Sequence, residues 1–187
     1  WCPTFLQTIR RMMTEMPGCE VYATSYVRCS IDGFQEEIKL NGIPSDKEFT
    51  LDNYFEVASK SDPPFCSISV VVSSKALTDI GGFPEEIHQG EDLLTWARLA
   101  AKYKTAYCRN PQSIFHTGES GRMEQPKRIP DDKDPVGKGL ETIYRDNPEI
   151  VDLPQYIALW HKMRASMFLR LSGKSKQCRQ EIRKAYE

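Results

Sequence analysis

The stretch that decides the fold reads SISVVVSSKALTDIGGFPEEIHQGEDLLTWARLA and occupies residues 67–100. It begins with a β-branched run at 68–72, which is typical of a buried strand. A short helix is expected over 74–80, because two glycines follow it and end it. A second helix is expected over 91–102, where apolar residues recur at helical spacing. This order of elements favours an α/β fold, with a sheet flanked by helices.

The flanking sequence predicts further elements of the same kind. In chain order these are a helix over 3–16, a strand over 19–28, a hairpin or long loop over 29–50 and a short helix over 50–55. After the second helix, two short strands are expected over 105–108 and 113–115, because Asn110-Pro111 separates them.

The last third of the chain has a different character. Residues 119–139 are rich in proline, glycine and charge, which predicts a mobile linker or loop. A helical tail is expected over 140–187, built from helices at about 138–146, 154–171 and 175–186. The apolar stripe of its middle helix is expected to be buried and consists of Tyr156, Trp160, Met163, Met167 and Leu171.

Composition excludes few classes of function. The net charge of −1 gives no reason to expect nucleic acid as a partner. No apolar run is long enough to cross a bilayer. The six cysteines include no C-x-x-C pair, so we expect free thiols in a reducing, cytoplasmic compartment.

The central segment resembles the second half of the catalytic domain of family 2 glycosyltransferases. The matching positions are Gly81, Gly82, Phe83, Glu85, Glu91, Asp92, Trp96 and Arg98. The first residues resemble the sequence that follows the acidic metal motif of that family, with matches at Trp1, Pro3, Phe5 and Leu6. The resemblance covers residues 1–116. Each piece is a weak motif alone, and their combination is more specific.

This resemblance implies a partial GT-A fold, a mixed Rossmann-like sheet flanked by helices, with a C-terminal α-helical extension. Residues 1–118 would be the acceptor-side part of the catalytic domain. The nucleotide-binding half and the acidic motif would precede Trp1, so residues 1–187 alone are expected to be inactive. The implied reaction is inverting, metal-assisted transfer of a sugar from a nucleotide-sugar donor to an acceptor hydroxyl, in polysaccharide or glycolipid synthesis.

The Glu91-Asp92 pair is the candidate for catalysis. Sugar transfer needs a base that takes the proton of the attacking hydroxyl. A carboxylate at a helix N-terminus is held as an anion by the helix dipole. We therefore expect Asp92 to act as the base and Glu91 to orient the acceptor. The structural alternative is that both residues only cap the helix, because acidic first turns are common.

Other candidates follow from the same resemblance. Trp96, Phe83 and Gly82 are expected to bind the acceptor, although packing and helix termination explain them equally well. His116 is expected to complete a Mn²⁺ or Mg²⁺ site whose other protein ligands precede Trp1, and its alternative is an ordinary loop histidine.

Several charged groups receive no catalytic assignment. The Asp-Asp-Lys-Asp run at 131–134 is interpreted as a solvated charge run, and His88 and His161 as surface or structural residues. Residues Glu119, Arg122 and Lys127 could close over the substrates. The basic terminal helix could contact an anionic membrane surface, in line with a lipid-linked acceptor and a location on the inner membrane face, or it could simply present a solvated face. A homo-oligomer through open sheet edges is also compatible with the sequence.

Two other classes of function remain open. One is a non-enzymatic module that binds a carbohydrate or a partner. The other is a glycoside hydrolase, which needs two carboxyl groups flanking the bond. Adjacent helical residues such as Glu91 and Asp92 point in different directions, which disfavours the hydrolase.

Overall fold

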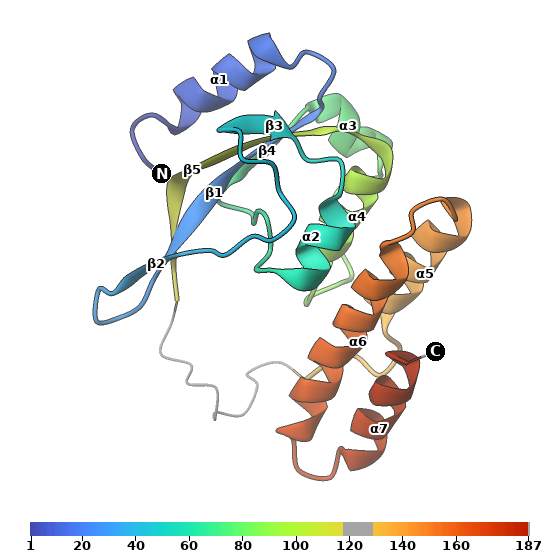
Figure 1. Ribbon diagram of the computed structural model, residues 1–187. Coiled ribbons are helices and arrows are strands. Elements are labelled where there is room, and N and C mark those ends of the chain that lie inside the picture. The colour runs from blue at the N-terminus through green and yellow to red at the C-terminus, as the bar shows by residue number, and fades with distance from the viewer. Residues whose placement is uncertain (118–128, 187) are drawn as a thin grey trace.

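A mixed β-sheet forms the centre of the computed structural model, which describes residues 1–117 and 129–186 (Figure 1). Strands β1 (Val21–Cys29) and β5 (Thr105–His116) lie parallel in its middle. Strands β2 (Gln35–Glu37) and β4 (Val70–Val72) both pair antiparallel with β1, and β3 (Glu48–Thr50) pairs antiparallel with β5. The expected α/β class, with a mixed sheet flanked by helices, is confirmed.

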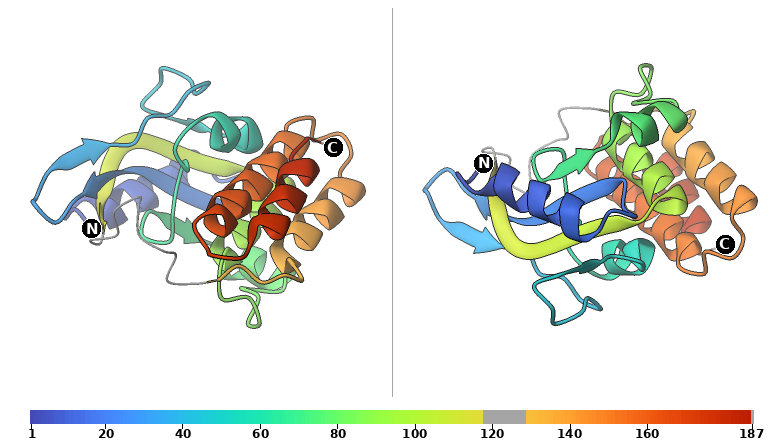
Figure 2. Two further views of the ribbon diagram at one scale, coloured as in Figure 1. Left: turned by 90° about the horizontal axis from the view of Figure 1, so that it is seen from below. Right: turned by 90° about the horizontal axis from the view of Figure 1, so that it is seen from above.

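Alternating residues of the two central strands face different helices, as the two-residue period of a strand requires. Tyr22, Ala106 and Cys108 pack under helix α1 (Phe5–Glu15) on one face. Ala23 and Tyr107 belong to the larger core on the other face. That core is covered by α2 (Tyr54–Lys60) and α4 (Glu91–Lys102), while α3 (Ser74–Asp79) follows β4 (Figure 2).

The two strands predicted around Asn110-Pro111 are one continuous strand, β5. Across from it, β1 pairs Thr24 with Cys108 and then Tyr26 with Ser113. The register therefore shifts at this point, and Pro111 lies within the irregularity, where its missing N–H removes no ladder hydrogen bond. The prediction of a break was wrong because the bulge accommodates the proline.

The helix predicted over 50–55 begins later than expected. Thr50 pairs with Ala106 as the last residue of β3, and the Leu51 N–H still donates to Thr105 O at 2.8 Å. Helix α2 starts only at Tyr54. Pairing with β5, which a local pattern does not reveal, keeps these residues on the sheet.

Residues 129–186 contain the helices α5 (Pro135–Asp146), α6 (Leu153–Leu169) and α7 (Ser175–Lys184). Leu140 and Tyr156 of the first two share one apolar cluster with Leu94 of α4, so α5 and α6 pack directly on the α/β unit. Helix α7 packs on α6 through Phe168 and Cys178. These helices cover the side of the molecule away from α1 (Figures 1 and 2).

The buried face of α6 differs from the predicted stripe. Tyr156 and Trp160 are buried as expected, but Met163 is 43% exposed. His161 and Arg164 are buried in its place. The prediction followed hydrophobicity, whereas this face is partly polar because α7 and the segment before α5 supply charged partners.

Two further expectations bear on localisation. All six cysteines are free thiols, and burial raises the pKa of Cys19 and Cys108. Within residues 1–117 and 129–186, no helix has both the length and the apolar character needed to cross a bilayer.

The expectations for Glu119, Arg122 and Lys127 lie outside the described residues.

Candidate functional site

Helix α4 begins at a backbone conformation that only glycine adopts readily. Gly90, its N-cap, has φ 81° and lies in the left-handed region. A Cβ at this position would stand 2.8 Å from the Trp160 ring and 3.3 Å from a methyl group of Val136. Glu91 and Asp92 follow at once in the first turn. Both the backbone conformation of Gly90 and the neighbouring side chains therefore fix the start of the helix that carries these carboxylates.

The carboxylate of Asp92 is partly buried and lies near two buried phenols. Its Oδ1 accepts from the Leu93 N–H at 2.7 Å. Burial raises the pKa of Tyr54 and Tyr156, and the negative charge of Asp92 adds to both increases. The two hydroxyl groups lie 3.4 Å apart. Asp92 thus lies at the positive end of the helix dipole, near two buried phenols whose raised pKa keeps them protonated.

The predicted acceptor residues lie together but differ in exposure. The Trp96 ring is buried at 5% exposure and meets Phe65 and Phe83 edge-on, at centroid distances of 5.8 and 5.6 Å. Phe83 is 45% exposed. Gly82 has φ 71°, and apart from its chain neighbours no described residue lies within 4 Å of the point that a Cβ would occupy there. Phe83 can therefore meet a ligand directly, while Trp96 supports Phe83 from within the core.

His116 lies at the end of β5, exposed and opposite Cys29 of β1. Only two residues join α4 to β5, so the helix runs antiparallel to the strand and begins toward the strand's carboxyl end. The strand is much longer than the helix, since a strand rises about 3.3 Å per residue and a helix about 1.5 Å. His116 consequently projects past the start of α4, and the structure does not bring it into contact with Glu91 or Asp92.

The N-terminal residues lie beside the same half of β5. The Cys2 N–H donates to Gln112 O at 2.8 Å, and the Thr4 hydroxyl donates to Gln112 Oε1 at 2.7 Å. Trp1 stacks on Phe5 with ring centroids 5.0 Å apart. The first residues therefore meet β5 four residues before His116 on the same strand.

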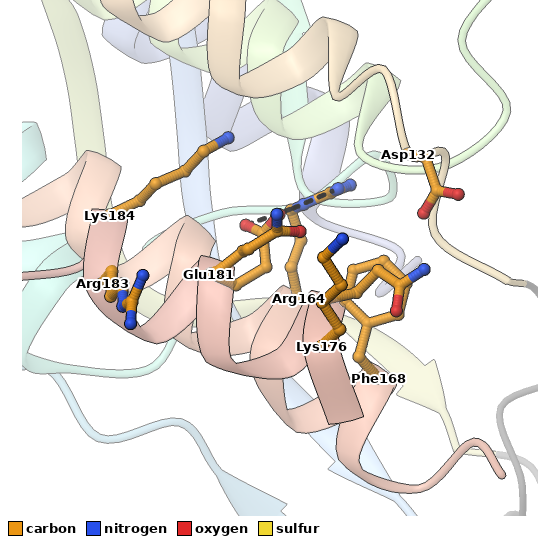
Figure 3. A pocket seen from close by; sticks show the side chains of 9 residues that line it. Asp132, Arg164, Phe168, Lys176, Glu181, Arg183 and Lys184 are labelled. Carbon is orange, nitrogen blue, oxygen red and sulfur yellow. Dashed lines mark hydrogen bonds and ion pairs between the residues drawn. The ribbon is translucent and has the colours of Figure 1, made fainter. Parts of the chain in front are cut away.

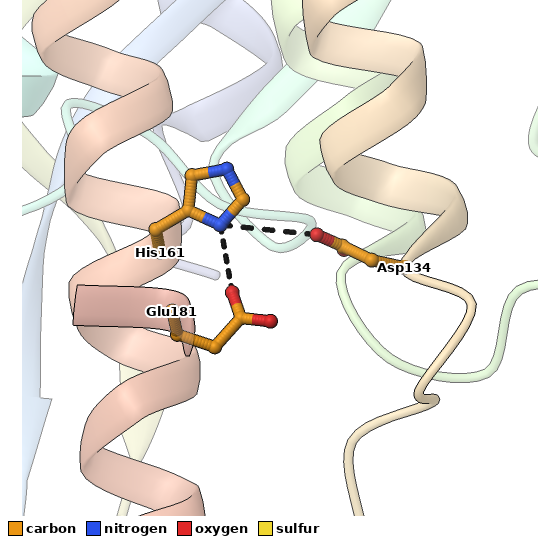
Figure 4. Close-up of side chains that lie close together, drawn as sticks. All are labelled: Asp134, His161 and Glu181. Carbon is orange, nitrogen blue, oxygen red and sulfur yellow. Dashed lines mark hydrogen bonds and ion pairs between the residues drawn. The ribbon is translucent and has the colours of Figure 1, made fainter. Parts of the chain in front are cut away.

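A buried ionic network between α5, α6 and α7 is the feature that the sequence interpretation missed (Figure 4). Asp134, which was interpreted as part of a solvated run, is only 5% exposed. His161 Nδ1 lies 2.7 Å from Glu181 Oε2 and 3.8 Å from Asp134 Oδ2. Arg164 reaches both carboxylates, with its Nη1 3.4 Å from Asp134 Oδ1 and its Nε 3.1 Å from Glu181 Oε2.

The interpretation of Asp134 was wrong because this residue has two structural tasks. Its side chain caps α5 by accepting from the Gly137 N–H at 3.1 Å. The same Oδ1 accepts from the indole N–H of Trp160 at 2.9 Å. A usable sequence signal was present, since an aspartate followed by Pro135 is typical of a helix start.

The neighbours of Glu181 favour its charged form. Burial raises the pKa of Glu181, but hydrogen bonds from His161 and Arg164 outweigh it and lower the value from 4.5 to about 2. Asp134, His161 and Glu181 also offer three metal-ligand atoms within 4.8 Å of one another. Since Arg164 already contacts both carboxylates, a divalent ion there would face a guanidinium. The chemistry therefore favours an ion-pair network over a metal centre.

Hollows adjoin the network on more than one side, and two of them bear on the candidate sites. A pocket of about 200 Å³ separates residues 86–89, which lead into α4, from Asp134, Val136 and Trp160. A groove of about 570 Å³ runs between α6 and α7, where Lys176, Arg183 and Lys184 surround the buried Arg164 and Glu181 (Figure 3). The groove is lined by residues of the helical tail and Asp132, and neither Glu91 nor Asp92 lines it.

No family model matches this chain, and a search of curated proteins finds no match either.

Proposed function

We propose that this chain is the acceptor-side part of a GT-A glycosyltransferase of family 2. It would transfer a sugar from a nucleotide-sugar donor to an acceptor hydroxyl, with inversion. The observation that carries the proposal is the Glu91-Asp92 pair, partly buried at the N-terminus of α4 and directly after the left-handed Gly90. In open α/β sheets, ligands bind outside the carboxyl ends of the strands, which is the side where α4 begins.

The chemistry assigned to the pair is proton removal and orientation. Asp92 accepts the proton of the acceptor hydroxyl while that oxygen forms a bond to the anomeric carbon. The bond from this carbon to the donor diphosphate breaks with its electron pair on the diphosphate. Glu91, one residue earlier, points elsewhere on the helix and holds a neighbouring hydroxyl of the acceptor.

A Mn²⁺ or Mg²⁺ ion would neutralise the leaving diphosphate. The imidazole of His116 is exposed at the end of β5, which fits a ligand open to a bound group. The acidic ligands that the resemblance implies would adjoin the first residues, which lie along the same half of β5 as His116. His116 is the one residue of this chain that we propose as a ligand.

The acceptor would be a saccharide or a lipid-linked saccharide, as in polysaccharide or glycolipid synthesis. Phe83 presents an exposed ring beside Gly82, and sugars pack well on such aromatic faces. Helix α7 exposes Ile182 among basic residues, and Tyr186 beyond it is 84% exposed. These features support peripheral contact with an anionic membrane face from the cytoplasmic side. Strand β2 lies at an edge of the sheet that the described residues form, and a second copy would pair there.

One observation favours a second candidate, a non-enzymatic carbohydrate-binding module. The exposed Phe83 ring packs edge-on against Trp96, and such an aromatic surface can hold a sugar without any catalysis. Such a module would bind saccharides without a nucleotide or a metal ion. It would also be indifferent to the charge of Asp92.

The test is a donor screen with the protein at its native length. UDP- and GDP-sugars are offered with Mn²⁺ and a panel of saccharide acceptors, and products are examined by NMR for the configuration of the anomeric carbon. Transfer with inversion supports the proposal. Saccharide binding with no binding or turnover of any nucleotide sugar would replace it with the binding module.

A further inference from the structure

The start of α4 is held by a residue of the helical tail. The Trp160 ring lies so close to Gly90 that a single added methyl group would approach it to 2.8 Å. The same methyl group would lie 3.3 Å from Cγ2 of Val136 in α5. Glycine has the widest backbone freedom of any residue, so a glycine directly before a functional pair leaves that pair poorly fixed unless something confines it. The side chains of Trp160 and Val136 confine Gly90 in this way.

Trp160 is itself fixed from its other side. Its indole N–H donates to Asp134 Oδ1 at 2.9 Å, and the Arg164 guanidinium lies 5.9 Å from the centre of its ring. Asp134 is held in turn by the Gly137 N–H and by Arg164. Asp134 is also the one non-glycine residue with positive φ, at 48°, among those described. A strained backbone of this kind persists only where its surroundings determine it strongly.

From these contacts we propose that Trp160 is a positioning residue for Glu91 and Asp92, and that the helical tail is part of the catalytic unit. This inference rests on the proposed function. Trp160 touches no reacting group. It limits the backbone of Gly90 and thereby sets the direction in which the first turn of α4 presents its carboxylates. Small misplacements of a catalytic group cost large factors in rate, so losing this support lowers kcat.

The structure supplies a direct reporter of this positioning. The Leu94 N–H donates to Gly90 O at 3.0 Å, which is the first hydrogen bond of α4. Hydrogen exchange at Leu94 therefore measures how firmly Gly90 is held. Trp160→Phe keeps an aromatic ring but removes the bond to Asp134. Phe168→Leu is the control, because it alters another buried aromatic residue of α6, which packs against Cys178 and beside Arg164, and leaves the hydrogen bond between Trp160 and Asp134 in place.

The experiment compares the two variants with the wild type, all at native length, in exchange at Leu94 and in transfer kinetics. Trp160→Phe is expected to speed exchange at Leu94 at least about fivefold. It should lower kcat about tenfold and leave the donor KM within about twofold, because positioning acts on the transition state. Phe168→Leu should match the wild type in both. If Trp160→Phe does not fold, Val136→Ala weakens the packing against Gly90 and leaves the residues of the ionic network unchanged.

Unchanged exchange at Leu94 in Trp160→Phe overturns the inference, and so does an equal increase in Phe168→Leu, which would indicate general softening. If the wild-type protein shows no transfer activity, that result contradicts the proposed function but not the positioning of this turn by Trp160. The exchange comparison then still decides whether Trp160 fixes this turn.

Discussion

His161 Nδ1 lies 2.7 Å from Glu181 Oε2, and this contact joins α6 to α7. Both side chains are almost completely buried. Arg164, one turn along α6 from His161, contacts the same carboxylate. The helical tail is therefore held together by ionic contacts as well as by the packing of Phe168 and Cys178.

The first prediction concerns acid stability. The pKa of Glu181 is about 2 in the folded protein against an ordinary 4.5, so the unfolded chain binds this proton more readily. The stabilisation is complete above about pH 5 and is lost as the pH falls toward 2. We expect Glu181→Gln to lose about 3 kcal/mol at pH 7, because it removes the buried carboxylate that Arg164 and His161 share. Urea denaturation at pH 7 and pH 3.5 measures both effects.

The control for that experiment is Glu149→Gln, which alters an exposed carboxylate. It should follow the wild type at both pH values. If Glu181→Gln kept the full pH dependence of the wild type, the acid sensitivity would have another origin.

A second prediction concerns metal ions at the same cluster. Because Arg164 contacts both carboxylates, we expect Zn²⁺, Mn²⁺ and EDTA to change the melting temperature of the wild type no more than that of His161→Gln. A bound ion at 100 times its Kd would add about 2.7 kcal/mol of stability and raise the midpoint by several degrees. A rise in the wild type that disappears in His161→Gln would show that the cluster binds metal after all. Thermal unfolding with each ion measures it.

A third prediction separates the two causes that restrict Gly90. Gly90 and Gly81 both have φ 81°, but only at Gly90 does an added Cβ meet another side chain. Gly81→Ala should therefore cost about 1 kcal/mol, from backbone strain alone. Gly90→Ala should cost about 2 kcal/mol more, because the Trp160 ring must move. Equal losses in chemical denaturation would mean that Trp160 yields freely and does not confine this turn.

A fourth prediction distinguishes the two aromatic residues of the proposed acceptor site. Trp96 is buried, so Trp96→Ala should cost about 3–5 kcal/mol of stability. Phe83→Ala should cost less than about 1 kcal/mol of stability, because nearly half of the ring is exposed, and should raise the KM for the acceptor. Denaturation and acceptor titration together check this. An unchanged acceptor KM in Phe83→Ala would remove Phe83 from the site.

Local patterns predicted much of this fold because several elements carry their own signals. Helix α4 has the bounds that its spacing indicated, and β1, β4 and α3 were also anticipated. What local patterns missed depends on distant partners. The continuity of β5 through Pro111 requires the bulge beside β1, and the short strand β3 exists only because β5 lies next to it.

The candidate site divides in the same way. Gly90, Glu91 and Asp92 are adjacent in sequence, so the turn that presents them could be recognised from residue types alone. Asp134 and Trp160 lie far from Gly90 along the chain, and only the packing of α5 and α6 on α4 brings them together. An aspartate in a run of charged residues looks solvated until its partners are known.

The central claim is that Asp92 acts as the base of a sugar transfer, and the most direct test compares the wild type with Asp92→Asn at native length. With the nucleotide sugar and Mn²⁺ that support turnover, the account predicts a fall in kcat of about a thousandfold, because a general base contributes about 10²–10⁴. Donor affinity should be retained, since Asp92 is assigned to the acceptor side. Full activity in Asp92→Asn would contradict the account and leave Asp92 as a helix-capping residue.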